Sequence, residues 1–224
     1  MNNNKRFIIM DLDGTLFDDF FEADRKIITQ IFSSNNFVLF IDSVARIINN
    51  LGFIKNTTSI LELRLFVYSF LSLKSYKKVI LEYKKSYSKC AYEALKRNYH
   101  YIEELKKLKY TVLIFSNNRY SKPISSVYKV FIVKNKPKKI KELYNYYKEQ
   151  VSFVVGDNYF DEILPARKLS IPNIFIKNKK PSIKRMLKAK DKKCYYSNTL
   201  EEVINIIKRS WKSNIEIRNL YYFF

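Results

Sequence analysis

Two carboxylates stand close together near the start of the chain, at Asp11 and Asp13. They directly follow residues 7–10, an apolar run typical of a fully buried strand, and Gly14 comes after them. Open α/β sheets bind ligands at the carboxyl ends of their strands, so paired acids here could do chemistry at a sheet edge. A calcium loop is disfavoured, because its glycine would stand elsewhere and a helix would precede it. An isolated acidic turn explains the pattern equally simply, so the rest of the chain must decide.

Polar residues also follow three later apolar runs that predict strands. They are Ser116 and Asn117 after residues 111–115, Lys136 after 130–133, and Gly156, Asp157 and Asp161 after 151–155. Because the strands of a parallel sheet point the same way, we expect these side chains to converge on one edge of the sheet. Each group alone is typical of a turn, but the four groups together, in this order, indicate one site.

The remaining chain supplies the elements that would position this site. Apolar residues at three- and four-residue spacing predict helices over residues 18–50, 58–70, 71–97, 102–108, 138–148, 163–169 and 199–208, and residues 173–176 predict a fifth strand. Alternating strands and helices predict an α/β protein with a largely parallel sheet covered on both faces. The helical stretch after the first strand is too long for an ordinary crossover and predicts an inserted subdomain of roughly seventy residues.

The four polar strand ends resemble the motifs of the haloacid dehalogenase-like (HAD) phosphohydrolases. Residues 11–16, with the sequence Asp-Leu-Asp-Gly-Thr-Leu, resemble the first motif, Ser116 the second, Lys136 the third, and Gly156-Asp157 with Asp161 the fourth. The resemblance covers about residues 5–18 and 98–210 and is fainter in the helical stretch between them. It implies a Rossmann-like core of residues 1–18 and 98–210, a helical cap of residues 19–97, and an aromatic tail of residues 211–224 whose role is left open.

The resemblance also implies a mechanism for the two N-terminal acids. Asp11 would attack phosphorus to form an aspartyl-phosphate, and Asp13 would act as general acid and base. The same likeness implies a Mg²⁺ site of oxygen ligands from Asp11, the backbone carbonyl of Asp13, Asp157 and Asp161, the last either binding the metal or only orienting its ligands. The dehalogenating branch of the family lacks a carboxylate at the place of Asp13, so phosphate-ester chemistry is preferred.

Three further positions bear on the implied site. Ser116, with Asn117 beside it, would bind a phosphoryl oxygen, and Lys136 would offset the negative charge of phosphate and carboxylates. Lys134 is an alternative catalytic amine, although the Pro137 that follows favours Lys136. Ser170 stands where relatives tend to carry glycine, which affects the geometry of the loop before the last core strand.

Composition limits the other functions. The 224 residues carry a formal net charge of +21, which makes nucleic acid a rival partner, but the lysines are spread along the chain and favour a solvated surface. No run of about eighteen apolar residues predicts a membrane span, so we expect a cytoplasmic protein with reduced Cys90 and Cys194. Tyrosines among lysines, including Tyr83, Tyr87 and Tyr92, are interpreted as core residues.

We therefore expect a Mg²⁺-dependent phosphatase of a small phosphorylated metabolite. The alternatives are a phosphosugar mutase of the same family and a basic nucleic-acid-binding protein on a vestigial HAD scaffold. The oligomeric state and the identity of the substrate are left open.

Overall fold

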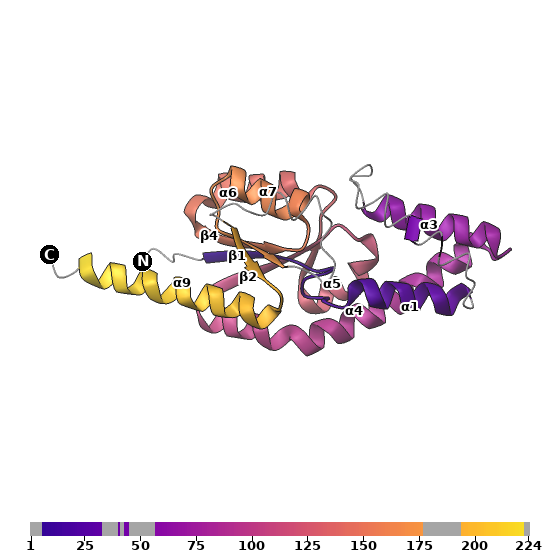
Figure 1. The fold of residues 1–224 in the computed structure, drawn as a ribbon, viewed down its shortest axis with the longest axis horizontal. Helices are drawn as coiled ribbons and strands as arrows, with labels where there is room; N and C mark the ends of the chain where they lie inside the picture. Colours follow the sequence, from indigo (N-terminus) through magenta and orange to yellow (C-terminus); the bar gives the residue numbers. More distant parts are fainter. Residues whose placement is uncertain (1–5, 33–39, 41–42, 45–56, 177–193, 222–224) are drawn as a thin grey trace. The chain divides into compact units, whose positions relative to one another are not determined.

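The computed structural model describes residues 6–32, 40, 43–44, 57–176 and 194–221 of the 224 (Figure 1). Its strands are β1 (Arg6–Asp11), β2 (Tyr110–Ser116), β3 (Val130–Ile132), β4 (Val151–Gly156), β5 (Asn173–Ile176) and β6 (Cys194–Ser197). They form one six-stranded sheet in the order β3-β2-β1-β4-β5-β6, and the pairings β2–β3, β1–β4, β4–β5 and β5–β6 are parallel. This topology confirms the predicted α/β class with a parallel sheet.

Helices occupy most of the described chain between the strands. They are α1 (Phe20–Phe32), α3 (Thr57–Leu71), α4 (Tyr76–Lys107), α5 (Lys122–Tyr128), α6 (Lys136–Tyr147), α7 (Leu164–Lys168) and α9 (Leu200–Tyr221). Two 3₁₀ turns, η1 (Arg119–Ser121) and η2 (Lys148–Gln150), and a π-helical turn, η3 (Tyr159–Ile163), complete the order.

The helices differ from the predicted ones in several places, and α5 was not predicted at all. Residues 71–97 and 102–108 were predicted as separate helices, but α4 is continuous from Tyr76 to Lys107, since no glycine or proline interrupts this stretch. The predicted helical stretch 18–50 is helical in α1, while its residues 33–39, 41–42 and 45–50 lie outside the described residues. Helix α9 runs to Tyr221 and so includes the backbone of most of the predicted tail.

The chain divides into two compact units, which are described separately. Unit 1 comprises Met1–Asp11, Asn98–Leu113 and Pro137–Phe224, and unit 2 comprises Leu12–Arg97 and Ile114–Lys136. The limits that the sequence predicts for a core, a helical cap and a tail stay predictions.

Unit 1 contains buried strands that need cover on both faces. All residues of β1 except Arg6 are buried, as are all of β4 except Ser152. Such continuous apolar runs are typical of parallel strands between two helical layers, whereas alternating runs suit a sheet with one solvated face. Figure 1 shows α6 and α7 over one face of these strands and α9 over the other.

Unit 2 contains an aromatic core with a buried ion pair. Tyr83 and Tyr87 of α4 are fully buried, which confirms their interpretation as core residues, whereas Tyr92 is 39% exposed and that interpretation was wrong for it. The Tyr83 hydroxyl donates to Asp24 Oδ1 at 2.5 Å, and Arg64 Nη2 donates to Asp24 Oδ2 at 3.0 Å. Burial raises the pKa of Tyr83 well above its usual range, so this hydroxyl keeps its proton at neutral pH.

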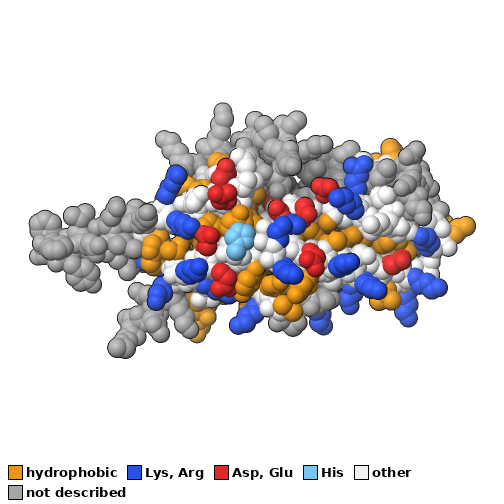
Figure 2. Space-filling view, turned by 90° about the horizontal axis from the view of Figure 1, so that it is seen from below, with side chains coloured by type: hydrophobic (Ala, Val, Ile, Leu, Met, Phe, Trp, Pro, Cys, Tyr) orange, Lys and Arg blue, Asp and Glu red, His pale blue; other side chains and the backbone are white. Residues whose placement is uncertain are grey.

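One face of the described residues carries mixed charges. Figure 2 shows Lys and Arg side chains interspersed with Asp and Glu on one face, rather than gathered into a continuous basic patch. None of the described helices has the length and apolar content needed to cross a lipid bilayer. Both cysteines, Cys90 and Cys194, are free thiols.

Ser170 has the backbone conformation of the glycine that the resemblance to the HAD-like family led us to expect there. Its φ angle is 58°, in the left-handed region. It follows the end of α7, where the Ile171 N–H donates to the Ala166 carbonyl at 2.9 Å and the Ser170 N–H donates to the Arg167 carbonyl at 3.0 Å. These two bonds form a Schellman motif, which ends a helix with a left-handed residue and is usually built on glycine.

Ser170→Gly should therefore increase the free energy of unfolding by about 0.5–1 kcal/mol. Glycine removes the left-handed strain of about 1 kcal/mol. Its greater conformational entropy in the unfolded chain lowers the free energy of unfolding and so offsets part of this stabilisation. Chemical denaturation monitored by circular dichroism measures the difference. Lys168→Gly is the matched control, because this exposed residue is helical and its replacement should lower stability by about 1 kcal/mol. Equal losses in both variants would show that the left-handed conformation carries no strain.

Candidate active site

Three buried carboxylates come together in unit 1, and we call them the acidic cluster. Asp11, Asp157 and Glu162 are 3%, 8% and 2% exposed. One carboxylate oxygen from each lies within 4.8 Å of the others, which makes the cluster a candidate metal-binding group among the described residues.

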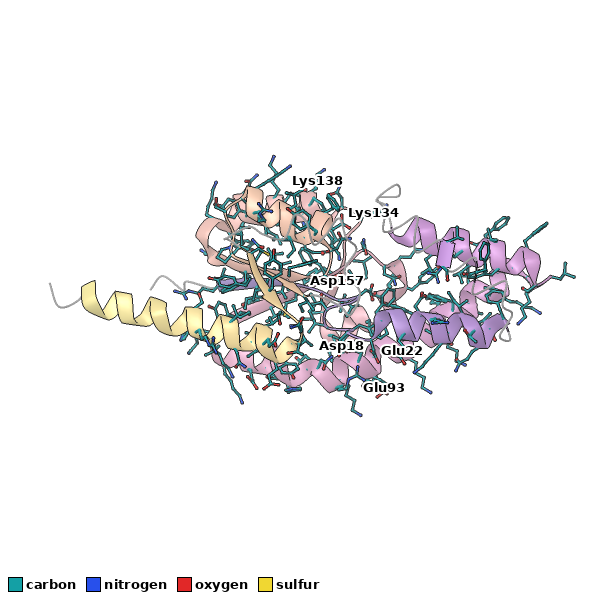
Figure 3. The ribbon with its side chains drawn as sticks, in the orientation of Figure 1. Asp18, Glu22, Glu93, Lys134, Lys138 and Asp157 are labelled. Carbon is teal, nitrogen blue, oxygen red and sulfur yellow. The ribbon has the colours of Figure 1, made fainter. Side chains whose placement is uncertain are left out.

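Parallel pairing of two strands places the two aspartates. Met10 of β1 pairs with Val155 of β4. Asp11 is the last residue of β1 and Asp157 directly follows β4, so both acids lie at the same edge of the sheet. Figure 3 labels Asp157 there. The sequence predicted this arrangement from the polar ends of the two apolar runs, and the structure brings these two acids together.

The turn that follows Asp157 positions the third acid. The Asn158 side-chain oxygen accepts from the N–H groups of Phe160 and Asp161, at 3.0 and 3.3 Å, and so caps the π-helical turn η3. Glu162 lies in this turn, and its Oε2 accepts from the Asn158 N–H at 2.8 Å. The charged side chain of Glu162 is thus fixed by the backbone of the same turn.

Gly156 leaves the space that Glu162 occupies. A Cβ atom at position 156 would lie 2.8 Å from both Cγ and Oε2 of Glu162, closer than real Cβ atoms come to a neighbour. The glycine before Asp157 therefore belongs to the cluster as well as to the strand end.

Asp161, which the sequence left open as either a metal ligand or a residue that orients the ligands, does not belong to the acidic cluster. Its Oδ2 accepts from Asn158 Nδ2 at 3.0 Å, and the residue is half-buried. The sequence reasoning missed Glu162, although the signal was available in the acidic pair 161–162. Which member of the pair faces the cluster depends on the π-helical turn, whose winding differs from that of an α-helix.

The acidic cluster fits a hard divalent cation. Three carboxylates within 4.8 Å repel one another, and burial makes this repulsion stronger than it is in water. A cation offsets it, and a set of ligands made only of carboxylate oxygens suits Mg²⁺ rather than a metal that prefers sulfur or imidazole.

Unit 2 holds a second group of polar side chains, which we call the hydroxyl ring: Asp13, Tyr87, Ser121 and Ser116. The Tyr87 hydroxyl donates to Asp13 Oδ1 at 2.5 Å, and the Ser116 hydroxyl donates to Asp13 Oδ2 at 3.2 Å. Ser121 Oγ closes the ring, at 2.9 Å from the Tyr87 hydroxyl and 3.1 Å from Ser116 Oγ. Both oxygens of the Asp13 carboxylate are therefore hydrogen-bonded.

Local turns bring the members of the hydroxyl ring together. Gly14, with φ of 83°, turns the chain after Asp13, and the Gly14 N–H donates to the Phe17 carbonyl at 2.9 Å. After β2, Asn118 caps η1 by accepting from the Tyr120 N–H, and its own N–H donates to Ser116 Oγ at 3.0 Å. This turn carries Ser121 back toward Ser116.

The remaining predicted site residues differ in exposure. Lys136, the first residue of α6, is 4% exposed, whereas Lys134 is exposed at the surface (Figure 3). A lysine is rarely buried in a protein unless its charge is paired, so burial favours Lys136 over Lys134 as the amine of a site. Asn117 is half-buried beside the fully buried Ser116. The catalytic and substrate-binding roles of these residues stay predictions.

Comparison with known proteins identifies the fold. No family model and no curated protein matches the sequence. Among solved structures, a haloacid dehalogenase-like family hydrolase from Xanthomonas campestris matches 96% of this chain and 95% of its own, with a TM-score of 0.53 and 10% identity. The HAD-hydrolase YfnB from Bacillus subtilis, a structure with bound magnesium, matches 91% of this chain and 99% of its own, with a TM-score of 0.55 and 12% identity. The chain has the HAD-like fold, as its motifs predict.

Proposed function

We propose that this chain, which has the HAD-like fold, is a Mg²⁺-dependent phosphohydrolase that cleaves a small phosphomonoester through an aspartyl-phosphate. The observation that carries the proposal is the buried acidic cluster at the ends of β1 and β4, of which Asp11 is the first member. A buried group of like charges is costly in a protein interior, so a functional role explains it better than a structural one.

The chemistry divides into two steps. An oxygen of Asp11 attacks phosphorus and the ester bond breaks, while Asp13 gives a proton to the leaving oxygen. Water then attacks the phosphorus of the aspartyl-phosphate, Asp13 takes a proton from it, and inorganic phosphate leaves with Asp11 restored. Each step is easier than a direct attack of water on the ester.

The acidic cluster would hold the metal through Asp11, Asp157 and Glu162. When bound, Mg²⁺ neutralises charge on the phosphoryl group and orients it. The magnesium in the similarly folded YfnB supports this choice of cation. We assign Asp161 an indirect role, because it accepts a hydrogen bond from Asn158, whose N–H in turn holds Glu162.

Neutral and positive groups would complete the site. Ser116 and Asn117, at the end of β2, are proposed to donate hydrogen bonds to the phosphoryl oxygens. The Ser116 hydroxyl has one proton, so it would then turn from Asp13 Oδ2 to the phosphate. The buried Lys136 is proposed to offset the charge that phosphate and carboxylates bring together.

A salt series with two kinds of substrate tests the proposed function. We expect a panel of small phosphomonoesters, assayed with Mg²⁺, to contain substrates whose kcat/KM changes only modestly from low to physiological salt. A 5′-phosphorylated oligonucleotide should bind less tightly as salt rises, by about 0.9 log units per log unit of salt for each duplex phosphate contacted, and should not be hydrolysed. A helical cap of the predicted kind encloses a small ester and excludes a duplex.

The contrary result is equally clear. Faster cleavage of the oligonucleotide than of every small ester at physiological salt would replace the small substrate with nucleic acid. Hydrolysis of neither substrate would contradict the phosphohydrolase itself.

A further inference from the structure

Tyr87 is a core tyrosine whose hydroxyl makes a hydrogen bond to a carboxylate. Its side chain is fully buried, and the hydroxyl donates to Asp13 Oδ1 at 2.5 Å. A phenylalanine would fill the same core volume without a polar atom, and a buried hydroxyl costs free energy unless it is hydrogen-bonded. The hydroxyl at this position therefore needs an explanation beyond packing.

The aromatic ring of Tyr87 packs against three other rings, one in the turn before α1, one in α1 and one in α4. Its centroid lies 5.9 Å from that of Phe17 and 6.2 Å from that of Phe20, and it stacks on Tyr83 at 6.2 Å. Phe17 is bridged to Asp13 through the backbone. The segment that carries Asp13 thus also packs against the ring whose hydroxyl contacts its carboxylate.

Ser121, at the end of η1, also contacts the Tyr87 hydroxyl. Its Oγ lies 2.9 Å from the Tyr87 hydroxyl and 3.1 Å from Ser116 Oγ, and Ser116 donates to the other oxygen of Asp13. Contacts at both carboxylate oxygens restrict the rotation of the Asp13 side chain. Tyr87 supplies the shortest contact of the hydroxyl ring, and its side chain is fully buried.

We propose that Tyr87 is a positioning residue for Asp13: its buried hydroxyl fixes the carboxylate that moves the proton in each chemical step. The inference rests on the proposed function, and it adds a residue of α4 to the site. Since Tyr87 acts through Asp13, its loss should slow the chemical steps and leave substrate binding almost unchanged.

Tyr87→Phe is the test, with kcat and KM measured on the best small phosphomonoester. We expect kcat to fall about ten- to a hundredfold, the usual effect of one hydrogen bond to a charged group, while KM changes by less than about threefold. The phenyl ring keeps the contacts with Phe17, Phe20 and Tyr83, so the variant should fold.

Tyr83→Phe is the matched control. Tyr83 lies one turn before Tyr87 in α4, is also fully buried, and also donates a 2.5 Å hydrogen bond to a carboxylate, that of Asp24. Its loss should lower thermal stability and leave kcat within about twofold of the wild type. A merely structural role for Tyr87 predicts the same result for both variants.

A wild-type kcat in Tyr87→Phe, or an equal loss of kcat in Tyr83→Phe, would overturn the proposal. The ¹³C shift of the Asp13 carboxyl, assigned with Asp13→Asn, gives a readout that does not need turnover. It should change in Tyr87→Phe and not in Tyr83→Phe. If the wild-type protein hydrolyses no ester, the proposed function fails, while an unchanged carboxyl shift in Tyr87→Phe would independently refute the positioning contact.

Discussion

Replacement of Asp11 by asparagine should reduce phosphomonoester hydrolysis by more than about a thousandfold. The amide cannot form the aspartyl-phosphate, so the two-step route is lost, and removal of a nucleophile typically costs several orders of magnitude. Initial rates over a substrate series give kcat/KM, and mass spectrometry after acid quenching detects the phosphorylated protein. The wild type should show a phosphoryl group on Asp11, and the variant should show none.

Asp18→Asn is the matched control for this loss. Asp18 is an exposed aspartate in the turn between β1 and α1, and its Oδ1 accepts from Arg97 Nη2 at 3.0 Å (Figure 3 labels it). An exposed ion pair contributes little to stability, so this variant should keep wild-type activity. Near-normal hydrolysis by Asp11→Asn, with unchanged circular dichroism, would refute the nucleophile assignment.

Removal of divalent cations should abolish turnover, and added Mg²⁺ should restore it. Because the acidic cluster offers only carboxylate oxygens, Zn²⁺ should not substitute at matched free concentration. Rates measured during chelation and titration with each metal provide the test. Activity that survives exhaustive chelation, or that returns only with Zn²⁺, would contradict a magnesium site.

Two neighbouring variants then separate the acids of the fourth motif. Glu162→Gln should raise the Mg²⁺ concentration for half-maximal activity by about ten- to a hundredfold, because the residue is a member of the acidic cluster. Asp161→Asn should raise it less, since Asp161 acts through Asn158. The reverse order of effects would make Asp161 a metal ligand, which is one of the two roles that the sequence left open for it.

The sheet could be predicted from the sequence where apolar runs mark its strands. Strands β1, β4 and β5 are almost wholly buried and β2 is buried over its last three residues, and each strand ends within one residue of its apolar run. Strand β6 was missed, because residues Cys194–Ser197 form no apolar run and are only partly buried. Its identity comes from backbone pairing with β5, which side-chain patterns do not encode.

The sequence predicts those residues of the candidate site that lie at the carboxyl ends of strands. Asp11 and Asp157 come together because parallel strands share an edge, a property that sequence spacing carries. Glu162 and Ser121 were not found, because each is placed by a short turn whose winding has no distinctive spacing. Tyr87 was correctly interpreted as core, but the same periodicity gives no sign of where its hydroxyl points.

The close approach of Gly156 and Glu162 means that these two positions cannot vary independently. A side chain at position 156 would occupy the volume that the Glu162 carboxylate fills. The acidic cluster therefore requires a residue without a Cβ atom at position 156 as well as an acid at position 162. Substitutions at two such positions are non-additive, because each changes the cost of the other. Among relatives of this chain, a residue larger than glycine at the position of Gly156 should therefore occur together with a shorter acid at the position of Glu162, or with an acid at another position of the turn.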